Sequence, residues 1–316
     1  HTALRWKYHH SPTNTPNANN VTGHHNARSE FNGVPAAATL IRSLNTISSA
    51  ATNVVSFADN SAPTSWQSMT VARRMEAVRA GRRNEGQQVL ELAVSAWRDT
   101  GGAFDPTVHD AVLAAGYTTD FASLPDDGGP VRAAPPAPGL DAVHLDPLVR
   151  AVTLPPGVHL DLGGIGKGRA ADLVATELLA AGARGVCLSM GGDVRLAGEP
   201  PATGWIVAVE ELPGTRLGLT RGGIATSART RRRWRRGDVE LHHLIDPRTG
   251  RPAPGAGRAV TVIAGTAADA EVLAKALYLL GPEAGGDLLA RHGATGVVVD
   301  EAGAAHPLPG FADYLL

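Results

Sequence analysis

The segment LHHLIDPRTGRPA, residues 241–253, brings together side chains that could carry out proton transfer. Two adjacent histidines, His242 and His243, precede Asp246, and a Pro-Arg-Thr-Gly sequence follows the aspartate. A neutral imidazole accepts protons near neutral pH, and a carboxylate can orient an imidazole or the nearby backbone. The Pro and Gly positions predict a tight turn. The segment therefore places possible proton-transfer groups beside a turn.

A glycine-rich stretch, DLGGIGKG at residues 161–168, is expected between a strand and a helix. Glycines let the backbone turn sharply and approach a ligand closely, and a helix N-terminus with its free N–H groups favours an anion such as phosphate. Lys167 adds a positive charge. The spacing matches neither a Walker A loop nor a Rossmann fingerprint. An anion-binding loop and a tight structural turn both remain open.

A second glycine pair, Gly191 and Gly192, follows another expected strand and precedes Asp193. The glycines allow a close approach to a ligand, and Asp193 could accept a hydrogen bond from a hydroxyl or an exocyclic amine. The same pattern also starts hairpins. Two glycine loops at strand ends, together with the His-Asp turn, favour a nucleotide-like ligand lying across several strand ends.

Several helices and strands are needed to position these groups. Asp105 at an N-cap and Pro106 at the first helical position predict a helix start, and Gly281-Pro282 predicts a helix end. Strands and helices do not alternate strictly, so the pattern favours an α+β fold or an irregular α/β fold. The expected helices cover residues 86–101, 105–116, 168–182 and 266–282, and the expected strands cover 157–164, 185–193, 204–210, 222–227, 258–264 and 295–300.

Composition bounds the class of protein. The chain has 316 residues, of which 43% are hydrophobic, enough to bury the core of one large domain or two modest ones. A formal net charge of −1 argues against a generic nucleic-acid or membrane-surface protein. The basic run 229–236 is a local exception, either a solvated edge or an anion-facing loop. The lone cysteine, Cys187, excludes an internal disulfide and a Cys-rich zinc site and is expected to be a small buried hydrophobe.

The first part of the chain is harder to interpret. Residues 1–32 are rich in Asn, Pro, Thr and His without a period, which predicts a disordered or atypical extension. Weak helices are expected within residues 33–85. The sequence shows no apolar stretch of roughly 20 residues and no signal-peptide core at its start. It therefore leaves the compartment open between cytoplasmic and exported or membrane-attached, with any membrane association only indirect.

Taken in order along the chain, six segments resemble the ApbE family of FAD:protein FMN transferases. The resemblance extends from about residue 87 to the C-terminus and implies one ApbE-like domain over residues 33–316. It also implies a two-lobed α+β fold with mixed sheets and FAD bound between the lobes. The six segments are GGAFDPTV (101–108), LDLGGIGKGRAAD (160–172), SMGGDVRLAG (189–198), ATS (225–227), HHLIDPRTGRP (242–252) and AEVLAKALYLLG (270–281).

The resemblance implies a reaction. The enzyme transfers FMN from FAD to a Ser or Thr hydroxyl in the flavinylation motif of an acceptor protein, forms a phosphoester, releases AMP and depends on Mg²⁺. Two alternatives are kept. The chain could be a non-catalytic FAD-binding relative, or an FAD pyrophosphatase in which water replaces the acceptor hydroxyl and FMN and AMP are released. No nucleic-acid partner is expected.

The resemblance also implies site residues. His243 matches the histidine of the family motif and is the expected base, with Asp246 beside it. The residues expected to bind FAD are Asp161, Gly163, Gly164, Lys167, Gly191, Gly192, Asp193 and Thr249. The expected metal positions are the Gly164 carbonyl, Glu271 and Lys275.

Lys275 departs from the family, which usually has Thr at this position. An ammonium group cannot ligate Mg²⁺. We therefore expect Lys275 to point outward along the helix, leaving Glu271, Asp269 and the Gly164 carbonyl to hold the metal. If Lys275 instead points inward, it should lie near the pyrophosphate. A second departure is Ala-Arg-Thr at residues 228–230, where the family commonly has Gly followed by Asp or Tyr.

Overall fold

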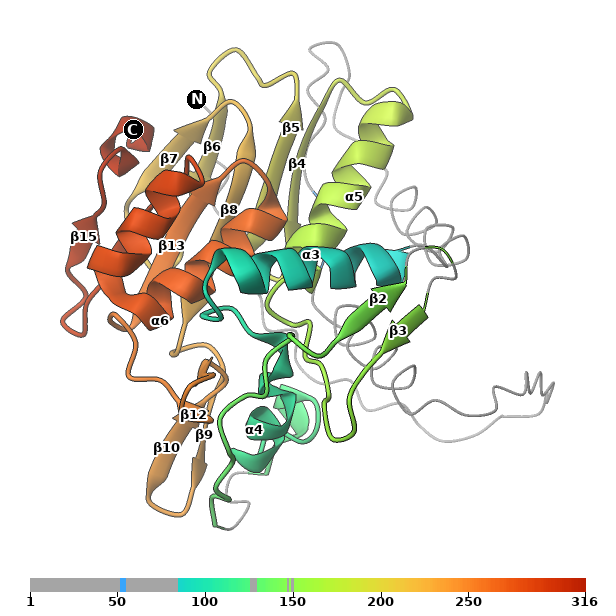
Figure 1. Ribbon diagram of the computed structural model, residues 1–316. Helices are drawn as coiled ribbons and strands as arrows, with labels where there is room; N and C mark the ends of the chain where they lie inside the picture. The colour runs from blue at the N-terminus through green and yellow to red at the C-terminus, as the bar shows by residue number, and fades with distance from the viewer. Residues whose placement is uncertain (1–51, 55–84, 126–129, 147, 149–150) are drawn as a thin grey trace, which may run out of the picture.

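The computed structural model of the chain describes residues 52–54, 85–125, 130–146, 148 and 151–316 (Figure 1). The extension expected over residues 1–32 lies outside these ranges, as do nearly all of residues 33–85. The described helices are α3 (Glu85–Asp99), η1 (Pro106–Val108), α4 (His109–Ala114), η2 (Phe121–Ser123), α5 (Gly166–Ala180), α6 (Ala267–Arg291) and η3 (Phe311–Tyr314). None of them is long and apolar enough to cross a membrane.

A seven-stranded sheet organises the larger lobe, in the order β1-β4-β5-β8-β13-β14-β15. Every pairing in this sheet is antiparallel. Its strands are β1 (Thr52–Val54), β4 (Gly185–Met190), β5 (Asp193–Gly198), β8 (Gly222–Ala228), β13 (Ala259–Ala264), β14 (Thr295–Val299) and β15 (Ala305–Pro307). The combination of separate helices with an antiparallel sheet confirms the expected α+β class. Mixed sheets were expected, but the described strands pair only in the antiparallel sense.

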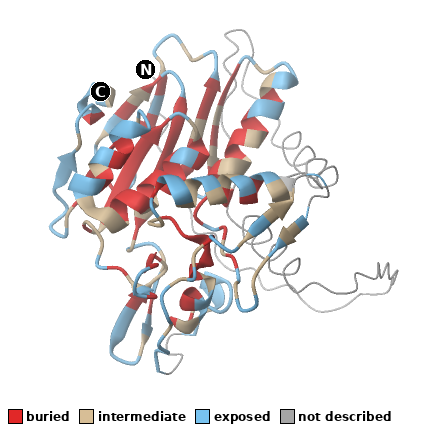
Figure 2. Cartoon of the chain, viewed as in Figure 1, coloured by how far each residue is buried: buried red, intermediate tan, exposed pale blue. Residues whose placement is uncertain are grey.

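Both faces of the sheet are covered. Every residue of β13 is buried, as expected for a central strand with packing on both sides. Val260 and Val262 pack in a cluster with α6, whereas Ala259 and Ile263 face a cluster with the hairpin of β6 (Trp205–Ala208) and β7 (Arg216–Leu219). Figure 2 shows the resulting buried interior along the central strands.

A smaller lobe lies below the sheet in Figure 1. It contains α4, the hairpin of β9 (Arg233–Arg236) and β10 (Val239–His242), and the short pair of β11 (Ile245–Asp246) and β12 (Arg251–Pro252). A separate hairpin joins β2 (His144–Asp146) to β3 (Ala151–Thr153). The apolar contacts of the smaller lobe involve Val108, Val112, Trp234, Leu241 and Ile245.

Three predicted elements need correction. The strand expected over residues 157–164 does not pair with the sheet; its Asp161 N–H donates instead to the Pro106 carbonyl (2.7 Å). The helix expected over residues 105–116 is split into η1 and α4, although Asp105 caps η1 as expected. Helix α6 breaks at Gly281, where φ is 81° and ψ is 174°, but a second helical stretch then continues to Arg291.

Helices α5 and α6 approach each other closely at Gly168. A Cβ atom there would overlap the backbone of α6 at the Ala267 carbonyl. We therefore expect Gly168→Ala to lower the free energy of unfolding by about 1–3 kcal/mol, the usual cost of overpacking. Urea denaturation measures this change. Gly286→Ala is the matched control, because Gly286 lies in α6 with only ordinary contacts around it. It should leave stability unchanged or raise it, and equal losses in both variants would contradict the close approach.

Candidate functional site

Lys167 lies at the start of α5, beside the two glycine loops, and its ammonium group is held between two carboxylates. Its Nζ is 3.1 Å from Asp193 Oδ2 and forms a short ion pair with Glu271 Oε1. The Lys167 side chain is only 20% exposed, and both carboxylates are buried. Burial alone would lower the pKa of Lys167, but the charges of Asp193 and Glu271 outweigh it and raise the pKa. The lysine is therefore a fixed positive charge.

Glu271 joins the start of α5 to α6. While Oε1 pairs with Lys167, Oε2 accepts a hydrogen bond from the Gly168 N–H (2.8 Å). That N–H belongs to the first turn of α5, where N–H groups lack partners within the helix. The carboxylate thus occupies the position at which a helix N-terminus favours an anion. Both of its oxygens are engaged by the protein.

Asp193 reaches the same point from the second glycine loop. Gly191 and Gly192 form the two-residue turn between β4 and β5, with φ values of 56° and 97°. A turn with two positive φ angles strongly prefers glycine. The hairpin interpretation is therefore correct, and it also carries Asp193 to Lys167. Burial and the neighbouring Glu271 raise the pKa of Asp193, with Lys167 opposing them.

The first glycine loop is shaped by Asp161. Its Oδ1 accepts a hydrogen bond from the Gly163 N–H (2.7 Å), an arrangement typical of an Asp-stabilised turn. The Gly163 carbonyl lies 3.4 Å from Lys167 Nζ. The structure therefore brings together Asp161, Gly163, Lys167 and Asp193, all of which were predicted to bind FAD.

Lys275 points inward, contrary to our expectation. It lies one turn after Glu271 on α6 and is partly buried. A Cβ atom on Gly164 would overlap the Lys275 ammonium group, which also lies 5.9 Å from the centre of the Phe104 ring. Burial lowers the pKa of Lys275, although the charges of Asp161 and Glu271 act in the opposite direction. Helical spacing placed residues 271 and 275 on one face, and that face is turned toward the glycine loop.

These contacts do not suit a magnesium ion at Gly164, Glu271 and Lys275. Mg²⁺ requires oxygen ligands in octahedral geometry, whereas Lys275 brings an ammonium group to Gly164 and Glu271 already uses both oxygens. Asp269, the expected substitute, accepts instead from the Thr266 hydroxyl (2.7 Å) at the N-cap of α6. The metal set implied by the resemblance therefore does not fit the described side chains.

His243 is partly buried, directly after β10. The ring Nδ1 is 3.4 Å from the Arg232 carbonyl oxygen, and the backbone N–H of His243 donates to the same oxygen (3.3 Å). Because a carbonyl only accepts, Nδ1 carries the proton in this contact and Nε2 keeps a free lone pair. Burial, Arg232 and Lys275 lower the pKa of His243 well below 6.5. The imidazole is therefore neutral at pH 7.

His242 has a different environment. Its Nδ1 accepts a hydrogen bond from the Leu244 N–H (3.3 Å), and its ring packs edge-on against Tyr278 with centroids 6.4 Å apart. Burial lowers its pKa as well. These contacts give His242 a local structural role beside the β10–β11 connection.

Asp246 fixes the turn rather than the imidazole. Its carboxylate accepts from the Arg248 backbone N–H (2.9 Å) and from the Arg248 guanidinium (3.1 and 2.9 Å). These hydrogen bonds lower the pKa of Asp246. The Asp246 carbonyl accepts from the N–H groups of Thr249 (3.1 Å) and Gly250 (2.9 Å). Thr249, predicted to bind FAD, is exposed, and its hydroxyl lies 3.4 Å from the same carbonyl.

The basic run 229–236 mostly forms an edge. Arg229 pairs with Glu301, Arg231 with Glu210, and Arg233 lies 3.5 Å from Glu240. This agrees with the solvated-edge alternative. Arg232 differs, because its carbonyl holds His243 and its charge lowers the pKa of that histidine and of Lys275.

In the described part of the chain, Lys167, Glu271 and Lys275 thus link the two glycine loops to α6. Residues 46–299 match the ApbE family. The chain belongs to the ApbE family. Its fold is similar to the crystal structure of the ApbE protein from Thermotoga maritima, with a TM-score of 0.63 and 24% identity over 91% of this chain and 93% of that one.

Relatives named FAD:protein FMN transferase include the two described next. The protein from Rhodobacter capsulatus is 34% identical over 191 residues, which are 58% of this chain and 36% of the relative. The protein from Haemophilus influenzae is 31% identical over 156 residues, which are 46% of this chain and 45% of the relative. The matched part thus spans less than half the length of either relative.

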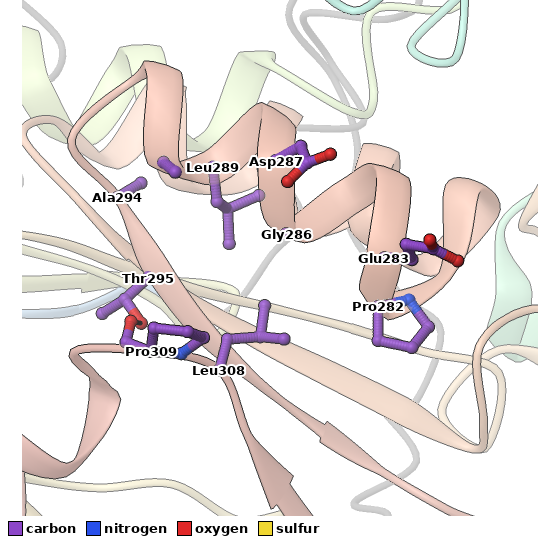
Figure 3. A pocket seen from close by; sticks show the side chains of 10 residues that line it. Pro282, Glu283, Gly286, Asp287, Leu289, Ala294, Thr295, Leu308 and Pro309 are labelled. Carbon is purple, nitrogen blue, oxygen red and sulfur yellow. Dashed lines mark hydrogen bonds between the residues drawn. The ribbon is translucent and has the colours of Figure 1, made fainter.

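A hollow of about 290 Å³ lies elsewhere on this ApbE fold, between the second half of α6 and the segment after β15 (Figure 3). Pro282, Leu308 and Pro309 form its apolar walls, and Glu283 and Asp287 border it. Two carboxylates and no basic side chain among its lining residues do not favour a phosphate-bearing ligand. The converging glycine loops remain the better candidate for such a ligand.

Two residues of the site were not predicted. Asp172 of α5 accepts from the N–H groups of Ala267 and Ala268 (both 3.0 Å) and pairs with Arg195 (3.0 Å), so it fixes the start of α6. A buried acid on an otherwise apolar helix face was the available signal. Arg232 gave no signal of its own within a run of arginines.

Proposed function

We propose that this ApbE-family chain transfers FMN from FAD to a Ser or Thr hydroxyl of an acceptor protein. The observation that carries the proposal is a neutral His243 whose pKa is lowered in part by the charge of Lys275. Lys275 in turn lies against the first glycine loop at Gly164. A proton acceptor and an anion-binding loop are the two elements that this reaction needs. The family match and the names of the relatives agree with it.

His243 supplies the base in this proposal. Its Nδ1–H donates to the Arg232 carbonyl, which orients the ring and leaves Nε2 to accept the proton of the acceptor hydroxyl. The hydroxyl oxygen forms a bond to the FMN phosphorus as the P–O bond to the AMP phosphate breaks. The proton goes to Nε2, and AMP leaves with the electron pair of the broken bond.

A positive charge near the first glycine loop serves the diphosphate. Lys275 brings its ammonium group to Gly164, whereas Lys167, beside the Gly163 carbonyl, is already paired with Asp193 and Glu271. The first turn of α5 begins near this loop. Cations aimed at developing phosphate charge stabilise the transition state. We place the pyrophosphate near residues 163–168 and the nucleoside near residues 191–193. The Mg²⁺ implied by the resemblance is not assigned to Glu271 and Lys275, because these groups do not fit it.

The test is incubation of the full chain with FAD and an acceptor peptide containing a Ser/Thr-Gly-Ala-Thr type motif, followed by mass spectrometry of the peptide. We expect a peptide carrying FMN and an equal amount of AMP. Release of FMN and AMP without a peptide adduct would replace the proposal with a pyrophosphatase. FAD binding without AMP release would replace it with a binding protein.

The last of these alternatives has its own supporting observation. Lys275 occupies the space at Gly164 with a positive charge, and a fixed ammonium can neutralise a phosphate without promoting transfer. A non-catalytic FAD-binding relative would show affinity for FAD and no AMP in the same assay. The retained base, His243, favours the transferase.

The rate of transfer should start to fall only at a lower pH than expected for an ordinary histidine with a pKa of 6.5. Because burial and the charges of Arg232 and Lys275 lower the pKa of His243, the imidazole stays unprotonated to a lower pH than an ordinary histidine. The measurement is the pH profile of kcat at saturating FAD and acceptor, which removes effects on binding. We expect the acid limb below pH 6.5. A limb at or above the ordinary value, with the fold intact by circular dichroism, would contradict the base assignment.

A further inference from the structure

Two histidines and an aspartate meet on the surface of the described part of the chain. Nδ1 of His109 and Nδ1 of His159 each lie 3.0 Å from Asp110 Oδ1. The ligand atoms of all three residues lie within 4.8 Å of one another. The two imidazole rings are tilted, with centroids 5.6 Å apart. Two segments far apart in sequence therefore present two nitrogens and a carboxylate to one point.

The backbone fixes this approach independently of the three side chains. The Asp161 N–H donates to the Pro106 carbonyl (2.7 Å), which ties the segment before the glycine loop to η1. Leu160 and Leu162 are buried, and side chains alternate in an extended segment. His159 is therefore directed away from the core, toward the start of α4. The arrangement of the cluster does not depend on its own hydrogen bonds.

The chemistry of the cluster matches a zinc ion. Two imidazole nitrogens and one carboxylate are a ligand set that Zn²⁺ accepts, with water completing the coordination. In the hydrogen-bonded form each imidazole can donate a proton to Asp110. A divalent cation replaces those protons and accepts the lone pairs. We propose that His109, Asp110 and His159 form a zinc-binding site, distinct from the metal positions implied by the ApbE resemblance.

The exposure of the cluster supports this proposal. The side chains of His109, Asp110 and His159 are 25%, 52% and 46% exposed, so an ion and its water can enter without rearrangement of the core. Partial burial raises the pKa of Asp110, but hydrogen bonds from the two histidines outweigh it and lower the pKa. The carboxylate is therefore ionised at pH 7.

An exposed His–Asp pair elsewhere provides a matched control. His306 Nε2 lies 2.8 Å from Asp300 Oδ2. This pair resembles half of the cluster but is not among the groups of three or more potential ligands within the described residues. Replacement of the histidine by alanine should therefore lower zinc affinity in the cluster and leave it unchanged in the His306–Asp300 pair.

The test is isothermal titration with ZnCl₂ on a full-length variant in which His9, His10, His24 and His25 are all alanine, so that these histidines do not add binding. We expect one equivalent of Zn²⁺. His159→Ala and Asp110→Asn each remove a direct ligand and should each weaken binding by at least the roughly 10–100-fold that loss of an outer hydrogen-bond partner costs. His306→Ala should leave the affinity unchanged.

Thermal unfolding and pH provide independent readouts. Because the ion joins α4 to the segment before the glycine loop, Zn²⁺ should raise the Tm of this variant and not that of its His159→Ala derivative. Affinity should also fall in acid, because protons compete with the metal ion for its ligand atoms. Equal Zn²⁺ affinity with and without His159, or no Zn²⁺ binding at all, would overturn the site.

Discussion

Replacing His243 with alanine should lower FMN transfer by roughly 10²–10⁴-fold, the usual effect of losing a general base. The expectation rests on its neutral imidazole, whose Nδ1–H is taken by the Arg232 carbonyl and whose Nε2 is left to accept a proton. The loss should appear in kcat. FAD affinity, measured by calorimetry, should change little, because none of the described contacts of His243 involves either glycine loop.

His242→Ala is the control for this experiment. The two histidines are adjacent and both have lowered pKa values, so a general effect of losing a buried imidazole would appear in both variants. The contacts of His242 are with the Leu244 N–H and the Tyr278 ring, which are structural. We expect a modest change in stability and less than a tenfold change in transfer. Similar losses from both variants would remove the assignment to His243.

Local sequence signals predicted the elements that carry the site. The apolar run at residues 258–264 and the glycine stop at residue 182 gave β13 and α5 because such signals depend on near neighbours. The pair Gly191-Gly192 left a hairpin turn and a ligand-binding loop open, and the structure shows the hairpin turn. The order of the motifs along the chain then indicated the family, which the match over residues 46–299 confirms.

Contacts between segments far apart in the sequence could not be predicted from these local signals. His159 to Leu162 alternate like a strand, but their backbone pairs with η1 at Pro106 rather than with the sheet. The direction of Lys275 depends on how α6 packs against α5. Helical spacing predicts that Glu271 and Lys275 share a face. That this face is turned toward the first glycine loop follows from the packing of α6 against α5, which the spacing does not contain.

The inward position of Lys275 leads to the second large expected effect. Lys275→Met removes the charge next to Gly164 while keeping a long side chain. We expect FAD affinity to fall by about 10–100-fold, because a hydrogen bond to a charged group contributes about 1.5–3 kcal/mol. Calorimetric titration with FAD measures this change. Arg291→Met is the matched control, because it removes one positive charge from the exposed end of the same helix.

Lys275→Thr separates the role of the ammonium group from that of a metal ion. The parent chain should bind FAD equally well with Mg²⁺ and with a chelator, because Lys275 supplies the charge and Glu271 is engaged by Lys167 and Gly168. In Lys275→Thr the ammonium is replaced by a hydroxyl oxygen, a ligand that Mg²⁺ can use. Removal of the ammonium group opens the space at Gly164 and lets Mg²⁺ displace Lys167 from Glu271. We therefore expect this variant to bind FAD weakly in chelator and to recover affinity when Mg²⁺ is added. If the parent chain loses its FAD affinity in chelator, then a metal ion, and not Lys275, neutralises the diphosphate.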